Sequence, residues 1–481
     1  MPSPRLPNPV RLVILGVGLL LARLGLVNPE RVRRTTDLAW PRIVTGLARM
    51  SKNAVDVAMV GAAVGSSAIA GVGFAGPFWG LAFALGGGVA AGTIALVSQR
   101  FGAEAFDELG LAIRSSALLA VVITVPLGAM FYLFPSELIG LLTSDPASRA
   151  LGADYLRIVA FGLPFAALNL IGSRTFIGLD DSWTPMVLRS GGAVANVVLN
   201  GVFIFGFGMG VAGAALGTVL SNAVIAAAFA VGLGRGGLPY LGTFPVQVSP
   251  LGRYAELDTL RDVIRIGLPV AGRQTVWTGA RFPMLAIVAA FGSHVAAAYI
   301  ITRRIMGLMN TPGWGFGLAS SSLVGQELGQ GEEASAAEYG RDIVRFSVAT
   351  YVVAALPVAL FAEPIVRLFV SGGAEPGTVP AAVTLVYAAC LSMIGQGLKS
   401  GAAGPLDASG DTRIPFYSQI LGMFGAAIPL AYLGTVTPLG MMGLYLSLIA
   451  EAAVPGAINY YRFSTGAWKA ISREYRPETA D

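Results

Sequence analysis

Cysteine, histidine and charged residues are all scarce in this sequence of 481 residues. It contains one Cys and one His, and only 12% of its residues are charged. A single Cys excludes a disulfide framework and a cysteine-based metal site, and a single His argues against a histidine metal cluster or a His-dependent hydrolase. Soluble domains have about 25% charged residues. Half that share, together with 54% hydrophobic residues, indicates an integral membrane protein.

The balance of charge is nearly even. Lys and Arg number 32 and Asp and Glu 27, which gives a formal net charge of +5. An excess this small is typical of the loops of a membrane protein and does not indicate a nucleic-acid-binding surface.

Long apolar stretches between turn-rich breaks predict the architecture. A bilayer core about 30 Å thick needs roughly 20 mostly apolar residues per helix. Twelve such stretches predict an all-α, polytopic membrane protein with twelve transmembrane helices. The predicted spans are 41–64, 69–96, 111–134, 155–177, 184–207, 210–233, 264–291, 294–321, 343–362, 380–401, 414–433 and 437–461.

A further apolar run, Leu12–Ala22, is too short to cross a membrane comfortably. A secretory signal peptide is the alternative interpretation, but Pro29 and a basic segment follow the run instead of a small-residue cleavage site. We therefore expect a retained helix that lies in the membrane interface.

The predicted connections differ in charge. Those after even-numbered spans, counted with their flanks, carry twelve basic residues, whereas those on the other side carry only Arg149 and Arg367. By the positive-inside rule the even-numbered connections are cytoplasmic, so both termini are cytoplasmic as well. We expect a multi-pass protein of the plasma membrane.

The longest polar connection, from Arg235 to Arg265, divides the twelve spans six and six. The predicted domains are an N-terminal interfacial segment (1–36), an N-terminal six-helix bundle (37–234), a cytoplasmic inter-bundle linker (235–262), a C-terminal six-helix bundle (263–465) and a cytoplasmic tail (466–481).

The two halves are related in sequence. Six-helix halves duplicated in the same orientation predict two pseudo-symmetric bundles around a central cavity, an arrangement found among secondary transporters. Chance similarity between Gly-rich apolar segments would not give two blocks at nearly the same offset. The first block pairs Gly65-Ser66 and Val97–Gly102 with Gly292-Ser293 and Val324–Gly329 at an offset of 227, and the second pairs Asp181, Pro185 and Gly213 with Asp411, Pro415 and Gly443 at an offset of 230.

Asp56 is the acid that stands well inside a first-half span. An Asp at the centre of a transmembrane helix costs roughly 2.5–3.5 kcal/mol, so it normally faces a protein interior or a wet cavity. Counted from the outer turns, Asn200 and Thr218 lie at the depth of Asp56, about 13 Å inward at 1.5 Å per residue. Asn196 lies one turn further in, on the face of Asn200. One carboxylate with two amide oxygens and a hydroxyl predicts a site for a hard cation, or a relay that binds a proton on Asp56.

A structural explanation for these polar residues stays open. Asn and Thr in transmembrane helices often do no more than hydrogen-bond neighbouring helices. Asp56 could also pair with Lys52, one turn earlier, or with Arg49, two turns earlier. Lys52 is therefore a candidate modulator of Asp56, because its ammonium group could occupy the place of a cation.

The second half concentrates basic residues instead. Arg281 and Arg303 share a depth on either side of Gly292, Arg304 is adjacent, and Glu451 is the acid best placed to neutralise them. A buried unpaired guanidinium is too costly to leave alone. We expect a salt bridge to Glu451 or a structural, water-facing role in preference to direct contact with a substrate in the cavity.

Other motifs do not indicate enzymatic chemistry. Gly71–Gly76 fits G-x-G-x-x-G but lies inside a span with no strand before it, so we interpret it as helix-packing glycine, like Gly88 with Gly92. No Walker sequence is present, and no nucleophile with a base can be assembled. We expect neither an enzyme nor a bound cofactor.

Several short segments together are similar to a known family. They are Asn53–Gly61, Val97–Gly102 with its partner Val324–Gly329, Gly178–Pro185, Asn196–Phe205 and Gly213–Thr218. In this order the chain resembles the multidrug and toxic compound extrusion (MATE) transporters over residues 37–465. The resemblance implies two six-helix bundles around a central cavity and antiport of an organic substrate against sodium ions or protons.

The pattern is most similar to the branch of archaeal and DNA-damage-inducible-type members, whose cation site lies in the N-terminal bundle. Asp56, Asn196 and Thr218 stand at positions that match that site. Two residues depart from the family pattern. The second acid of the site is here Asn200, which makes a relay through a pair of Asp residues unavailable, and the acid that another branch carries in the tenth span is replaced by Gln396.

We expect a monomeric secondary active antiporter that exports organic, cationic or amphipathic compounds in exchange for sodium ions or protons. Its expected partners are the lipid bilayer and a small organic substrate, with no nucleic acid, and its only expected ion is the coupling ion. The alternative is a flippase for an anionic lipid-linked precursor, motivated by Arg281, Arg303 and Arg304.

Overall fold

The computed structural model describes residues 8–370 and 377–477, most of which are helical. They divide into two compact units. We call Val44–Ala271 the amino-terminal bundle, and the described residues before Val44 and after Ala271 the carboxy-terminal bundle.

The division falls inside two helices, α2 (Pro29–Val64) and α10 (Leu257–Gly279). Each has a proline close to the division, Pro41 in α2 and Pro269 in α10. A proline inside a helix removes one backbone hydrogen bond and bends the helix.

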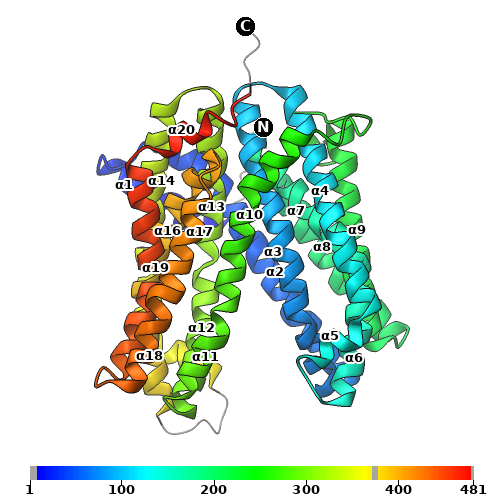
Figure 1. Cartoon of the computed structure of the whole chain (residues 1–481), viewed down its shortest axis with the longest axis vertical. Helices are drawn as coiled ribbons and strands as arrows, with labels where there is room; N and C mark the ends of the chain where they lie inside the picture. Colours follow the sequence, from blue (N-terminus) through cyan, green and yellow to red (C-terminus); the bar gives the residue numbers. More distant parts are fainter. Residues whose placement is uncertain (1–7, 371–376, 478–481) are drawn as a thin grey trace. The chain divides into compact units, whose positions relative to one another are not determined.

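The amino-terminal bundle is built around α3, which contacts α4, α6 and α7, while α8 packs against α9. Figure 1 shows these helices in blue to green along the length of the bundle. Their bounds are α3 (Ser66–Gly102), α4 (Phe106–Leu133), α5 (Pro135–Gly140), α6 (Pro146–Val159), η1 (Ala160–Gly162), α7 (Leu163–Gly178), α8 (Trp183–Gly201), η2 (Val202–Gly206) and α9 (Gly210–Arg235).

The segment predicted as an inter-bundle linker, 235–262, packs on the amino-terminal bundle. Two short strands, β1 (Gly237–Leu238) and β2 (Gly242–Thr243), pair antiparallel within it. Val246 and Val248 are buried in the same apolar cluster as core residues of α7 and α9. Helix α10 already begins at Leu257, inside the predicted linker.

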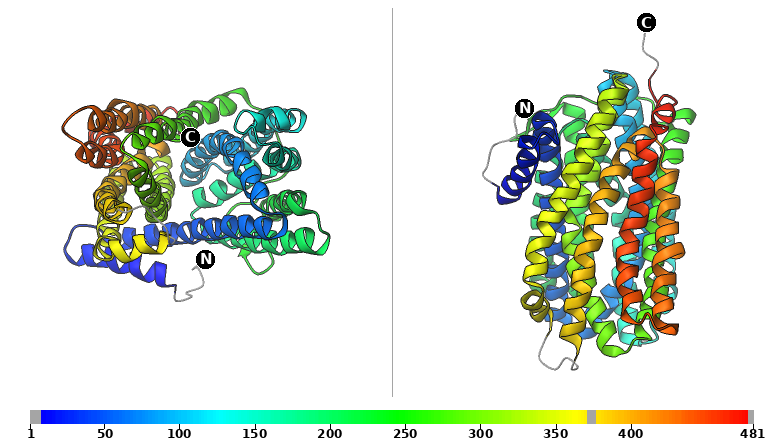
Figure 2. Two further views of the ribbon diagram at one scale, coloured as in Figure 1. Left: turned by 90° about the horizontal axis from the view of Figure 1, so that it is seen from below. Right: turned by 90° about the vertical axis from the view of Figure 1, so that its left-hand side faces the viewer.

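The carboxy-terminal bundle is built around α16, which contacts α13, α14 and α19. Figures 1 and 2 show α14, α16 and α19 side by side. The bounds are α1 (Pro9–Arg23), α11 (Arg281–Ala289), α12 (Ser293–Met309), α13 (Thr311–Gly329), α14 (Glu333–Leu360), α15 (Ala362–Phe369), α16 (Thr378–Ser409), α17 (Arg413–Ile420), η3 (Leu421–Ala427), α18 (Ile428–Val436), α19 (Met441–Ser464) and α20 (Trp468–Ser472).

Each predicted span coincides with one helix or with consecutive helical segments, and the all-α fold is confirmed. Within residues 8–370 and 377–477, nine helices are long and apolar enough to cross a membrane. Helix α2 falls short because it carries polar residues, and two further spans are interrupted at Ala280 and Asn310. Pro283 and Pro312 follow these interruptions closely and cannot donate the backbone hydrogen bonds of a continuous helix.

The amino-terminal end of the chain differs from the prediction. Helix α1 covers the expected short helix Leu12–Ala22, but α2 begins at Pro29, well before residue 41. The last part of the predicted interfacial segment 1–36 is therefore the start of the first long helix. The first turns of α2 are basic and polar, so the hydropathy pattern does not predict them as part of an apolar span.

The helix boundaries reproduce the repeat. The first residues of α4 and α14 are 227 positions apart, and so are their last residues. The first residues of α3 and α12 are separated by the same offset. Gly65 and Gly292 precede these two starts with φ of 103° and 104°. Glycine adopts such a conformation at little cost, which explains its recurrence in both turns.

Glycine also sets the distance between α3 and α10. A Cβ atom on Gly88 would lie 2.7 Å from the carbonyl oxygen of Gly267, and one on Gly92 would lie 2.6 Å from that of Val263. The two backbones therefore meet directly, as expected for the Gly88 and Gly92 packing pair.

Candidate functional site

Asp56 of α2 faces the amide side chain of Asn200 on α8. Nδ2 of Asn200 donates to Oδ1 of Asp56 at 2.8 Å and lies 3.4 Å from Oδ1 of Asn196, one turn earlier on α8. Asn196 and Asn200 are almost completely buried, with 1% and 0% exposure. The depth argument from the sequence therefore places these three side chains together, as the structure does.

Thr218 of α9 joins the cluster through Asn196. Nδ2 of Asn196 lies 3.3 Å from Oγ1 of Thr218 and 3.3 Å from Oγ of Ser221. The Thr218 hydroxyl donates in turn to the carbonyl of Ala214 at 3.0 Å. The polar path thus runs from α2 through α8 to α9, so Thr218 is connected to Asp56 by way of the two Asn side chains.

Lys52 occupies the other side of the carboxylate. Its Nζ lies 2.6 Å from Oδ2 of Asp56, and both side chains retain less than a fifth of their exposure. Of the two pairings considered for Asp56, Lys52 and Arg49, the structure shows the first. The site therefore contains its own positive charge one helical turn from the acid.

The local backbone fits this arrangement. Asn196 and Asn200 are one turn apart on one face of α8, and the π-helical segment η2 begins at Val202, just beyond them. Gly217 of α9 has no Cβ, and any Cβ there would collide with Oδ1 of Asn200. Helix α9 can approach the amide because this position is glycine.

The cluster presents oxygen atoms suited to a hard cation. Oδ1 of Asn200 is buried and has no hydrogen-bond partner among the described residues. The other predicted cation-binding groups are the carboxylate of Asp56, the amide oxygen of Asn196 and the hydroxyl of Thr218, and in this arrangement Nδ2 of Asn200 faces Asp56 and Asn196. A sodium ion or a proton on Asp56 would compete with the ammonium group of Lys52.

Two residues of this region were missed from the sequence. Ser221 follows Thr218 by three residues, so the helical i, i+3 spacing could have identified it. Tyr155 of α6 lies near Thr218 and Asp56 and packs against the apolar residues around Val60 and Ile204. Its position on a different helix left no periodic signal linking it to Asp56.

In the carboxy-terminal bundle, Arg303 forms the expected salt bridge with Glu451. Nη1 of Arg303 lies 2.6 Å from Oε2 of Glu451, and both side chains are largely buried. Nε1 of Trp277 lies 3.4 Å from the other carboxylate oxygen. This charge is therefore neutralised within the bundle, as the cost of a buried guanidinium requires.

Three other basic residues of this half, Arg281, Arg304 and Arg273, do not contact Glu451 in the same way and have different surroundings. Arg281 stacks on the ring of Trp277 at 3.8 Å, a cation–π contact, and Arg304 is exposed. Arg273 forms two hydrogen bonds with Asp407 of α16, at 3.3 and 2.9 Å, a pair that the sequence analysis did not identify. Nε2 of Gln396, on the same helix, lies 3.1 Å from Oγ of Ser400.

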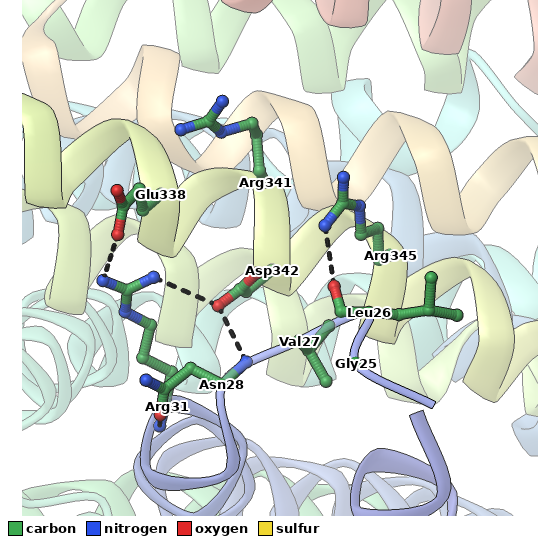
Figure 3. A pocket seen from close by; sticks show the side chains of 9 residues that line it. All are labelled: Gly25, Leu26, Val27, Asn28, Arg31, Glu338, Arg341, Asp342 and Arg345. Carbon is green, nitrogen blue, oxygen red and sulfur yellow. Dashed lines mark hydrogen bonds and ion pairs between the residues drawn. The ribbon is translucent and has the colours of Figure 1, made fainter. Parts of the chain in front are cut away.

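A pocket of about 390 Å³ lies where the turn between α1 and α2 meets α14 (Figure 3). Arg31 contacts Glu338 at 2.6 Å and Asp342 at 3.2 Å, and Arg345 donates to the carbonyl of Leu26 at 2.7 Å. These charges bind one another and fasten the turn to α14. The charged residues that line the pocket therefore have a structural role within the carboxy-terminal bundle.

The sequence is similar to a protein family and to multidrug resistance proteins over most of its length. The sequence pattern of the MatE family matches residues 41–202 and 269–433. The chain is 27% identical over 454 residues to the probable multidrug resistance protein NorM of Rhodopseudomonas palustris, covering 89% of this chain and 90% of that protein.

Solved structures share the fold at lower sequence identity. A MOP superfamily transporter from Pyrococcus furiosus gives a TM-score of 0.82 with 19% identity, covering 96% of this chain and 99% of that chain. The bent form of the Vibrio cholerae MATE transporter VcmN gives a TM-score of 0.83 with 19% identity, covering 96% and 100%.

Proposed function

Because the chain belongs to the MatE family of membrane transporters, we propose that it is a secondary active antiporter that exports organic compounds in exchange for sodium ions or protons. The expected substrates are cationic or amphipathic. The naming of a relative as a probable multidrug resistance protein supports this substrate class.

The observation that carries the proposal is the partly buried carboxylate of Asp56, held between Lys52 and Asn200. An acid inside a transmembrane helix is expensive unless a protein group or an ion compensates it. We assign coupling-cation binding to Asp56, Asn196, Asn200 and Thr218, with Ser221 supporting Asn196.

Lys52 modulates this site in the proposal, because the cation and the ammonium group compete for one carboxylate. A sodium ion at Asp56 displaces the ammonium group of Lys52. A proton on Asp56 neutralises the carboxylate that the ammonium group contacts. Either event separates Lys52 from Asp56 and changes the contacts between neighbouring turns of α2. A ligand shifts a conformational equilibrium only through its different affinity for the two states, and this exchange supplies such a difference.

We further propose that the protein acts as a monomer in the plasma membrane with both termini in the cytoplasm. The excess of basic residues in the even-numbered connections supports this orientation. The repeated helix boundaries support two duplicated six-helix halves, 37–234 and 263–465, joined through residues 235–262.

The alternative, a flippase for an anionic lipid-linked precursor, receives less support. It requires free positive charge in the carboxy-terminal bundle, but Arg303 is bound by Glu451 and Arg273 by Asp407. Arg281 and Arg304 are the remaining charges that it could use. A flippase that used these two charges would lose its activity when they are reversed, whereas drug export by the proposed antiporter would stay intact.

The experiment is export of a fluorescent organic cation by proteoliposomes, with sodium and pH gradients imposed separately. Wild-type protein should respond to at least one gradient, and Asp56→Asn should lose at least nine-tenths of the gradient-driven rate. Glu137→Gln, which removes an acid of the short helix α5 outside the site, is the control and should export normally. Export by Asp56→Asn at the wild-type rate would refute coupling through Asp56.

A further inference from the structure

The amino-terminal bundle contains a second charged cluster that the proposed antiport does not use. Arg174 lies on α7 and Arg189 on α8. Each has a buried Nη1 atom with no hydrogen-bond partner among the described residues. Leaving a buried donor unpaired costs free energy, and the cost is greater when the donor is charged.

The charges of this cluster have the same sign. Arg174 and Arg49 lie near enough to Arg189 to act on it electrostatically, and Arg49 likewise acts on Arg174. The guanidinium of Arg49 lies over the ring of Phe83 at 5.3 Å. Groups of like charge repel one another, so bringing them near one another costs free energy that an opposite charge would offset.

The carboxy-terminal bundle provides an internal comparison. Three of its partly buried arginines have acidic partners, Arg273 with Asp407, Arg303 with Glu451 and Arg462 with Asp411. At the repeat offset of 230, Asp411 corresponds to Asp181 of the amino-terminal bundle. Asp181 instead accepts a hydrogen bond from the backbone of Thr184 at 2.9 Å, at the start of α8.

The same offset pairs Arg189 with Gln419 of α17, a neutral side chain. The duplicated halves have therefore diverged at this position, and the amino-terminal half has a positive charge where the other half has none. The two helices start at the same offset, at Trp183 and Arg413, so the two positions lie at the same distance from a helix start and differ in the charge of the side chain.

Arg174 and Arg189 stand on either side of the connection between α7 and α8. Arg174 lies five residues before Leu179 and Arg189 six residues after Trp183, which places both roughly 7 to 9 Å from the connection at 1.5 Å per residue. A long side chain at this depth can usually extend to the membrane surface. In each of these guanidinium groups the Nη1 atom is instead buried within the bundle.

We propose that Arg174 and Arg189, with Arg49 beside them, bind a phosphate-bearing anion. Guanidinium groups match the geometry of phosphate oxygens and donate paired hydrogen bonds to them. Such an anion would satisfy the unpaired Nη1 donors and remove the repulsion among the three charges. The phosphate can come from the headgroup of an anionic lipid or from a soluble phosphate compound, since the recognising chemistry is the same.

The test is a thermal unfolding titration of the purified full-length protein at constant ionic strength. The probes are inorganic phosphate, short-chain phosphatidylglycerol and, as a zwitterionic comparison, phosphatidylcholine with the same chains. Wild-type protein should be stabilised by phosphatidylglycerol or by phosphate more than by sodium chloride. Stabilisation by phosphatidylglycerol alone identifies a lipid headgroup, whereas stabilisation by both anions identifies a soluble phosphate group as sufficient.

Arg174→Gln and Arg189→Gln should each weaken binding of the effective probe at least tenfold. Arg235→Gln, which removes an exposed Arg at the end of α9 in the same bundle, should bind like wild type. Arg189→Lys retains the charge without the paired donors and should bind several-fold more weakly, which keeps the test informative if a Gln variant does not fold. The proposal is wrong if neither anion stabilises the protein beyond chloride, or if the Arg189 variants bind as tightly as Arg235→Gln.

Discussion

The ammonium group of Lys52 lies 2.6 Å from the carboxylate of Asp56, one turn away on the same helix. The opposite oxygen of that carboxylate accepts a hydrogen bond from Asn200 at 2.8 Å. The carboxylate is thus shared between a permanent cation of the chain and the neutral amide group of Asn200. If a coupling ion binds here, it must compete with Lys52.

Removing Lys52 should strengthen cation binding. Lys52→Gln eliminates the competing charge and leaves both oxygens of Asp56 available, so the apparent affinity for sodium should rise about tenfold, which corresponds to about 1.4 kcal/mol. Sodium-dependent thermal stabilisation measures this affinity, because a ligand that binds the folded state stabilises it by an amount set by the ratio of ligand concentration to Kd. Lys469→Gln, on α20, is the control. An unchanged sodium affinity in Lys52→Gln would mean that the two cations do not compete.

Removing the Asn200 amide should weaken cation binding. Asn200→Ala deletes the hydrogen bond to Asp56 and a buried amide oxygen, so the apparent cation affinity should fall at least tenfold. The matched control is Asn459→Ala on α19, since Asn459 is buried and accepts an interhelical hydrogen bond from Ser418 at 2.8 Å. This control should alter stability without altering cation affinity. Equal losses of affinity in both variants would indicate a general effect of lost interhelical hydrogen bonds.

Breaking the Arg303–Glu451 pair should destabilise the protein. Glu451→Gln leaves a largely buried guanidinium without its carboxylate, a change that typically costs about 3–5 kcal/mol. The double variant Arg303→Gln/Glu451→Gln should recover much of this loss, because no charge is then left unpaired. Denaturant or thermal unfolding in detergent measures both effects.

The control for this pair is Glu363→Gln, since Glu363 and Arg367 form a pair at 2.6 Å in which both side chains are more than half exposed. Exposed pairs contribute little to stability, so this variant should unfold like wild type. A Glu451→Gln variant as stable as Glu363→Gln would contradict a structural role for the buried pair.

The contact between α3 and α10 should tolerate no side chain at Gly88. Gly88→Ala would bring a Cβ within 2.7 Å of the carbonyl oxygen of Gly267, and overpacking of this kind costs about 1–3 kcal/mol. Gly87→Ala is the matched control, because nothing lies within 4 Å of a Cβ at that position. If both variants have the same melting temperature, the close approach of the two helices is not required.

The helices were predictable from the sequence because the bilayer imposes a minimum length on each apolar stretch. The repeat offset then predicted matching boundaries, and α4 and α14 follow it at both ends. The hydropathy pattern did not predict the start of α2, whose first turns are polar. It also did not predict the interruptions before α11 and α13. A proline breaks or only bends a helix according to its neighbours, which a hydropathy pattern does not describe.

The candidate site was predictable as far as depth determines contact. Helical rise alone placed Asp56, Asn200 and Thr218 at one level. The rotation of each helix is not fixed by rise, so the sequence left the pairing of Asp56 with Lys52 open and missed Tyr155. The Arg273–Asp407 pair was also missed, because it joins α10 to α16 across 134 positions of the sequence.

The most direct test of coupling through Asp56 is the binding affinity for an exported organic cation, measured on purified protein over a range of sodium concentration and pH. Thermodynamic linkage is reciprocal: if the coupling ion weakens binding of the substrate, the substrate weakens binding of the coupling ion by the same factor. We predict that raising the concentration of the coupling ion lowers the substrate affinity of wild-type protein and has no effect on Asp56→Asn. The same dependence in both proteins would contradict a coupling site at Asp56.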